Sequence, residues 1–162
     1  MNDTSHLAQM KAYSEAAKSG LYAKQSGLVG KYDNVRRLWE DEITRMFIRP
    51  YLERLIEHKT ARMQRVRIMD LGCGSADGYE LLTGIRHRDA DLQDFEVTLL
   101  TPATLGAYLG IELNGHLIEQ ARNIYGHNHK LEFRQASFAE GLPLDPNERP
   151  YDLYFSSYGT CS

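Results

Sequence analysis

Residues 66–74 combine an apolar run, one carboxylate and two glycines at a spacing that suits a ligand site. The apolar run ends in Asp70, and a turn that contains Gly72 and Gly74 follows it. A helix-like stretch, 75–82, begins directly after the turn. Glycines let the backbone approach a ligand and adopt unusual φ angles, and a helix N-terminus offers unpaired N–H groups with a partial positive charge. This order of strand, turn and helix predicts a site for a nucleotide-like cofactor.

A second carboxylate stands at the end of another apolar run, 107–112, which closes with Glu112. Asn114 follows as the predicted N-cap of the next helix. In a compact βαβ unit the second acid follows the glycine turn by roughly 20 residues, whereas Glu112 lies 42 positions after Asp70. The excess predicts an inserted loop or hairpin at about 85–106.

Residues 1–60 are predicted to form an N-terminal helical segment. A first helix covers 4–18, and a stop follows at Gly20. A second helix begins after residue 34 and carries apolar side chains at helical spacing, which indicates core packing. Pro50 should kink or split this helix because proline lacks the amide hydrogen that a helix interior uses.

Two further strands are predicted, at 131–135 and 151–156, with turn residues between them at 141–150. The strands therefore alternate with helices along the chain. Alternation of this kind predicts an α/β fold of βαβ units, with a parallel sheet and right-handed crossovers.

The composition is that of an ordinary globular domain, with 162 residues, 25% of them charged and 42% hydrophobic. The formal net charge of −3 argues against a nucleic-acid-binding surface. The two cysteines, Cys73 and Cys161, form no metal-ligand spacing, so no metal is expected. No stretch resembles a signal peptide or approaches the roughly 20 apolar residues of a membrane span, so the expected location is the cytoplasm, without membrane contact.

Four motifs in order resemble the class I S-adenosylmethionine-dependent methyltransferases over roughly 32–158. Residues 70–74 match the glycine motif of that family, 110–114 its acid after the second strand, 133–143 its third-strand segment and 151–157 its fourth. The resemblance implies S-adenosylmethionine as cofactor and S-adenosylhomocysteine as product. The cofactor-binding residues that it implies are Tyr32, Asp70, Gly72, Cys73, Gly74, Glu112, Leu113, Ser137, Phe138 and Ser156.

On this resemblance, the backbone of 72–74 would pass beside the methionine moiety, and Asp70 would organise that turn. The carbonyl of Ser156 would face the methionine amino group. Tyr32 resembles tyrosines that cap the methionine carboxylate in some members.

The nucleoside would be held by the ends of the second and third strands. Glu112 would accept hydrogen bonds from the two ribose hydroxyls, which suits a carboxylate with two acceptor oxygens. Leu113 would lie against the adenine, and Ser137 and Phe138 would border its polar edge. The family often has an aspartate at the position of Ser137, and serine is a weaker, uncharged acceptor.

Members of that family have seven strands in the spatial order 3-2-1-4-5-7-6, and this chain supplies four. The implied fold is a truncated Rossmann-like parallel sheet of order 3-2-1-4 over 61–162, with helices on both faces. The outer edge of the fourth strand would lack a partner and could support self-association. We therefore expect the chain to be an N-terminal fragment that keeps most of the cofactor cleft and has little or no turnover alone.

The cofactor carries an activated methyl group, so catalysis would consist mainly of aligning the acceptor and excluding water. No residue is identified as a general base, and His116, His127 and His129 are expected at the surface, away from the methyl group. The acidic net charge favours a small-molecule acceptor over a nucleic acid, and a protein acceptor stays open.

Two alternatives remain for the site. One is a nicotinamide- or flavin-binding Rossmann domain, whose fingerprint has a third glycine at position 77, where this chain has Asp77. The other is a non-catalytic cofactor-binding or scaffolding module.

Overall fold

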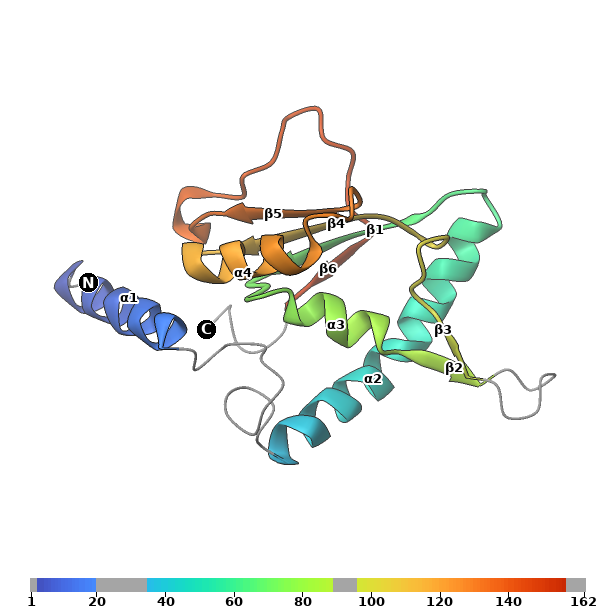
Figure 1. Cartoon of the computed structure of the whole chain (residues 1–162). Helices are drawn as coiled ribbons and strands as arrows, with labels where there is room; N and C mark the ends of the chain where they lie inside the picture. The colour runs from blue at the N-terminus through green and yellow to red at the C-terminus, as the bar shows by residue number, and fades with distance from the viewer. Residues whose placement is uncertain (1–2, 20–34, 89–95, 157–162) are drawn as a thin grey trace.

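The computed structural model describes residues 3–19, 35–88 and 96–156 (Figure 1). The elements are α1 (Asp3–Lys18), α2 (Val35–Thr60), β1 (Val66–Leu71), α3 (Asp77–Thr83), β2 (Arg86–Arg88), β3 (Glu96–Thr98), β4 (Leu105–Glu112), α4 (Gly115–Tyr125), β5 (Leu131–Gln135), a 3-10 turn (Phe138–Glu140) and β6 (Leu153–Phe155). No helix in these three ranges is long and apolar enough to cross a membrane.

Four parallel strands form the main sheet, in the order β5-β4-β1-β6 (Figure 1). The predicted parallel α/β architecture is therefore confirmed. In the register of the sheet, Asp70 on β1 stands beside Gly110 on β4 and Phe155 on β6. Because parallel strands end at one edge, the segments that follow β1, β4, β5 and β6 gather at the carboxyl edge of this sheet.

The segment predicted as an insertion, 85–106, contains β2 and β3, which pair antiparallel as a separate two-stranded sheet. The predicted strand order does not include this second sheet. β6 pairs with β1, and no other strand pairs with it in the part of the chain that the structure describes. Self-association through its free edge stays a prediction.

One face of the main sheet packs against helices. Ile68 and Tyr108 project from the strands into a buried cluster that includes Leu52 of α2, Leu82 of α3 and Ile118 of α4. Figure 1 shows α3 and α4 together on this side of the strands. These helices hold β1 and β4 in place, and with them the turn that follows β1.

The opposite face packs differently, and the prediction of helices on both faces is wrong for the described residues. Its buried cluster contains Met69, Leu109, Ile111 and Tyr151, and no residue of a described α-helix contributes to it. Leu144, in the loop 141–150, packs against the cluster. That loop contains three prolines, which lack the amide hydrogen that a helix needs.

Helix α2 is one helix of 26 residues that runs through Pro50, so the predicted split is wrong. Residues on both sides of the proline, Ile48 and Leu52, contact the core. Packing of this kind compensates for the hydrogen bond that proline cannot donate.

Candidate functional site

The glycine turn, residues 72–76, lies at the carboxyl edge between β1 and α3. The amides of Gly72 and Cys73 both donate to the carbonyl oxygen of Ile111 on β4, at 2.7 and 3.0 Å. The φ angles of Gly72 and Gly74 are 75° and 56°, in the left-handed region that glycine adopts without steric cost. The turn is thereby tied to the neighbouring strand.

Ala76, at the start of α3, also has a positive φ angle, of 73°. For a residue with a Cβ atom this conformation costs about 1–2 kcal/mol. Such strain occurs often at ligand sites, where the surrounding contacts maintain it. Here the contacts are hydrogen bonds from the amides of Ala76 and Asp77 to the carbonyl of Cys73, both 3.0 Å long.

Glu112 connects the end of β4 to the glycine turn. Its side chain is 4% exposed. Oε2 accepts a hydrogen bond from the amide of Gly74 at 3.1 Å, and Oε1 accepts one from the amide of Asn114 at 2.9 Å. Asn114 caps α4 as predicted, because its side chain accepts from the amide of His116 at 3.0 Å. The structure thus brings together the two residue groups, 72–74 and Glu112, that the sequence singles out.

Asp70 is fully buried below the turn, and two residues that sequence reasoning missed hold it there. The hydroxyl of Tyr108 on β4 donates to Oδ2 of Asp70. Gly78 on α3 leaves space for the carboxylate, since a Cβ atom at Gly78 would lie 2.1 Å from the same Oδ2 and 2.9 Å from the ring of Phe155. In the sequence, Gly78 only stands one place after the expected fingerprint position, so no local signal points to this packing.

Cys73 lies in the glycine turn, and the pKa of its thiol depends on burial and on the carboxylates nearby. Its thiol is buried, and a Cβ atom at Gly110 would lie 2.7 Å from its Sγ, so glycine is needed beside it. Burial raises the pKa of the Cys73 thiol well above its ordinary value, and the charges of Asp70 and Glu112 raise it further. Cys73 is therefore a packing residue that keeps its proton, and two carboxylates lie close to it.

The first helix also reaches the site, which the sequence did not indicate. The hydroxyl of Tyr13 on α1 donates to Oε1 of Glu112 at 3.3 Å. Figure 1 shows α1 beside the carboxyl ends of β5 and β4. The small, scattered apolar residues of 4–18 gave no sign of this contact, which joins residues 99 positions apart.

A pocket of about 420 Å³ lies between α1 and the corner where β4 meets α4. Its lining residues come from three elements: Ser14, Lys18, Leu113, Asn114, Gly115, His116, Glu119 and Gln135. Leu113, the predicted adenine contact, is among them. His116 lines the same pocket and is half-buried, whereas His127 and His129 are exposed as expected.

The remaining predicted residues follow β5 and β6. The amide of Ala136 donates to the carbonyl of Glu112 at 3.0 Å, which places Ser137 and Phe138 just past the end of β4. Phe138 is 38% exposed and Ser137 is half-buried. Ser156 is exposed and directly follows Phe155, the register partner of Asp70. Tyr32 lies outside the described residues. No group of three or more metal-ligating side chains occurs within the described ranges.

No protein-family model and no curated protein matches the chain. Solved structures similar to it include a protein-L-isoaspartate O-methyltransferase (14% identity, TM-score 0.40). Two others are a human methyltransferase 10 domain containing protein (18%, 0.44) and a SAM-dependent methyltransferase from Thiobacillus denitrificans in complex with S-adenosyl-L-homocysteine (19%, 0.35). The matches cover 67%, 70% and 67% of this chain but only 29%, 46% and 37% of those proteins. All three are titled methyltransferases.

Proposed function

We propose that the chain binds S-adenosylmethionine at the carboxyl edge of its sheet and that the protein is a methyltransferase acting on a small molecule. One observation carries the proposal: Oε2 of Glu112 accepts from the amide of Gly74 at 3.1 Å. The carboxylate suited to a ribose therefore lies against the turn suited to the methionine part. A ligand that joins these two parts would span that contact.

The hydrogen bonds of Glu112 suit a sugar with two neighbouring hydroxyls. Oε2 accepts from the amide of Gly74, and Oε1 accepts from the amide of Asn114 and the hydroxyl of Tyr13. Each carboxylate oxygen accepts about two hydrogen bonds. One ribose hydroxyl would donate to Oε2, and the other would take the place of the Tyr13 hydroxyl on Oε1.

The charge of the turn favours a cationic ligand. Burial raises the pKa of the Cys73 thiol, and the nearby carboxylates of Asp70 and Glu112 raise it further, so both negative charges lie close to the turn. S-adenosylmethionine carries a positive sulfonium and a positive ammonium group. A unit charge about 6 Å from a carboxylate gains about 3 kcal/mol at an effective dielectric constant of about 20. This attraction would add to the hydrogen bonds of the ribose.

The same charge opposes the dinucleotide alternative. A dinucleotide would place its anionic pyrophosphate at the turn, where the two carboxylates repel it. Asp77 adds a third carboxylate, 9% exposed, at the position where the dinucleotide fingerprint has a glycine. The turn is therefore better suited to the sulfonium cofactor.

Bound S-adenosylmethionine would supply an activated methyl group. The residues of this chain would bind and orient it: the backbone of 72–74 for the methionine part, Glu112 for the ribose and Leu113 for the adenine. Asp70 would support the turn from below. The formal net charge of −3 favours a small-molecule acceptor over a nucleic acid.

Calorimetric titration of the chain with S-adenosylmethionine, S-adenosylhomocysteine and NAD⁺ tests this proposal. We expect saturable binding of the first two and none of NAD⁺. Glu112→Gln keeps the size of the side chain but removes its charge, so the affinity for both ligands should fall about tenfold or more. The loss should be larger for S-adenosylmethionine, which is a sulfonium cation, than for S-adenosylhomocysteine, which is a neutral thioether at sulfur. Glu57→Gln, at an exposed position of α2 outside this site, should leave both affinities unchanged. Tighter binding of NAD⁺ than of S-adenosylmethionine would contradict the proposal. So would a Glu112→Gln protein that binds S-adenosylmethionine as tightly as the parent chain does.

A further inference from the structure

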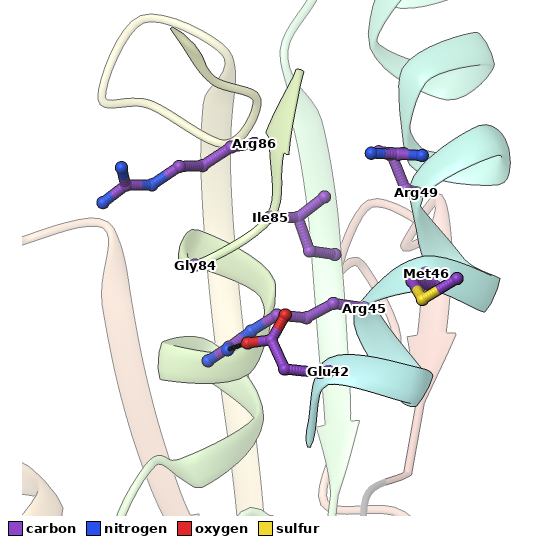
Figure 2. A pocket seen from close by; sticks show the side chains of 7 residues that line it. All are labelled: Glu42, Arg45, Met46, Arg49, Gly84, Ile85 and Arg86. Atoms are coloured by element: carbon purple, nitrogen blue, oxygen red, sulfur yellow. Dashed lines mark hydrogen bonds and ion pairs between the residues drawn. The ribbon is translucent and has the colours of Figure 1, made fainter. Parts of the chain in front are cut away.

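A second pocket, of about 460 Å³, lies between α2 and the corner where α3 meets β2 (Figure 2). Its seven lining residues are Glu42, Arg45, Met46, Arg49, Gly84, Ile85 and Arg86. Three carry a guanidinium and one carries a carboxylate, so the lining has a formal positive charge in a chain that is negative overall. Helix α3 separates this pocket from the glycine turn, and its seven residues span about 10 Å.

Arg45 is held in a fixed position within this pocket. Its Nε donates to the carbonyl of Leu81 at 3.3 Å, and its Nη1 pairs with Glu42 at 2.5 Å. A Cβ atom at Gly84 would lie 2.9 Å from Nε and Nη2, so the glycine leaves room for the guanidinium. A cation held in this way loses little side-chain entropy when a ligand binds.

Two further arginines stand around Arg45. Arg49 lies one turn later on α2, and Arg86 lies across the pocket at the start of β2, with Gly84 and Ile85 between them (Figure 2). Both side chains are exposed. Arg49 makes no hydrogen bond or ion pair with the described residues, so its charge is available to a ligand. Guanidinium groups suit phosphate oxygens because they are always charged and offer parallel N–H donors.

Another pocket with arginines serves as a comparison within the molecule. It has a volume of about 380 Å³ and includes Arg65, Arg67 and Arg149. There, Arg67 lies over the ring of Tyr151, 4.7 Å from its centroid, and pairs with Glu148 at 3.7 Å. Arg67 is thus engaged by the protein, as Arg45 is by Glu42 and by the carbonyl of Leu81. The pocket at Arg45 differs in its larger volume and in Gly84, which leaves room for the guanidinium.

We propose that the pocket between α2 and the α3–β2 corner binds a phosphate-type oxyanion, either free or as the phosphomonoester end of a small molecule. Arg45 provides the fixed contact through its remaining N–H donors. Arg49 and Arg86 close over the anion from the two sides of the pocket. The proposal does not depend on the identity of the ligand at the glycine turn.

Titration of the chain with inorganic phosphate and with phenyl phosphate at low ionic strength, followed by NMR or calorimetry, tests the site. We expect saturable binding of at least one probe, weakened about tenfold or more by Arg49→Gln combined with Arg86→Gln. Both positions are exposed, so the variant should keep the thermal stability of the parent chain. Arg54→Gln, on α2 outside the pocket, is the matched control and should bind as the parent does.

The two probes distinguish the two sources of the anion. Tighter binding of phenyl phosphate assigns the pocket to a phosphomonoester, whereas equal binding assigns it to the free anion. The proposal is overturned if neither probe saturates, if the double variant binds as well as the parent, or if Arg54→Gln weakens binding equally.

Discussion

The two ends of helix α3 differ in charge, burial and freedom. At its start, Asp70 and Asp77 are buried beside the glycine turn, and Gly78 lies in contact with the carboxylate of Asp70. At its end, Arg45 binds the carbonyl of Leu81 in an open pocket with two exposed arginines. Both placements follow the helix dipole, which favours negative charge at the start of a helix and positive charge at its end.

The difference between the two ends lies in what surrounds the charges. The carboxylate of Asp70 is fully buried, accepts from the hydroxyl of Tyr108 and lies against Gly78, where an added Cβ atom would also meet the ring of Phe155. The guanidinium of Arg45 is held by one hydrogen bond and one ion pair, but it is the end of a long side chain and can shift slightly without moving the backbone. We therefore expect the start of α3 to tolerate little change and the end to tolerate much. Three predictions test this contrast.

The largest expected effect comes from adding one methyl group at each end. In Gly78→Ala the new Cβ atom would overlap the buried Asp70 carboxylate at 2.1 Å, and the free energy of unfolding should fall by about 3 kcal/mol. In Gly84→Ala the overlap is 2.9 Å with the guanidinium of Arg45, which can move, so the loss should stay below about 1 kcal/mol. Urea unfolding measures both. Equal losses would show that the two ends are equally constrained.

The contacts of Gly78 also show where sequence reasoning ends. The strand at 131–135 and the cap at Asn114 were predictable because each rests on neighbours in the chain: alternation for the strand, and one side chain with the next amides for the cap. The space that Gly78 leaves for Asp70 depends on how α3 packs on β1. The hydrogen bond from Tyr13 to Glu112 joins residues 99 positions apart. No pattern in a single sequence indicates such contacts.

Two regions of the fold differ from what their local sequence predicts, and in both the cause is tertiary packing. Pro50 predicts a kinked or split helix, but α2 is one helix through the proline, with Ile48 and Leu52 packed on the core. A helix was expected to cover the second face of the sheet, yet the loop 141–150, which contains three prolines, packs there through Leu144. The site itself was more predictable than its surroundings, because the glycine turn and Glu112 are placed by strand ends, which sequence patterns locate well.

A smaller effect is expected from removing the hydroxyl that binds Asp70. Tyr108→Phe leaves the ring in place but takes a hydrogen bond from a buried carboxylate, so the free energy of unfolding should fall by about 2 kcal/mol. Tyr79→Phe, whose ring stacks edge-on against Tyr108 at 5.3 Å, is the matched control and should change stability by less than about 0.5 kcal/mol. Arg49→Gln, in the open pocket at the end of α3, should likewise change the free energy of unfolding by less than about 0.5 kcal/mol. An equal loss of stability in Tyr79→Phe would mean that the effect of Tyr108→Phe is not specific to the hydrogen bond with Asp70.

The smallest effect is a change in the pH dependence of stability. The pKa of the buried Cys73 thiol is raised above its ordinary value near 9, first by burial and then by Asp70 and Glu112. Above about pH 9 the unfolded chain therefore loses a proton that the folded chain keeps, and the free energy of unfolding falls by up to about 1.4 kcal/mol per pH unit. Burial raises the pKa of Tyr108 as well, so a second such fall begins near pH 10.

Cys73→Ser removes the first of these groups, because a serine hydroxyl does not titrate in this range, and it keeps nearly the same size beside Gly110. Unfolding in urea at several pH values between about 8 and 11 measures the slope for both proteins. Above about pH 9 the slope of the variant should be shallower than that of the parent, by up to about 1.4 kcal/mol per unit. The difference should persist above pH 10, because the folded thiol keeps its proton until the pH reaches its raised pKa, while Tyr108 contributes equally to both proteins. Identical slopes throughout would mean that burial and the two carboxylates do not keep the thiol protonated.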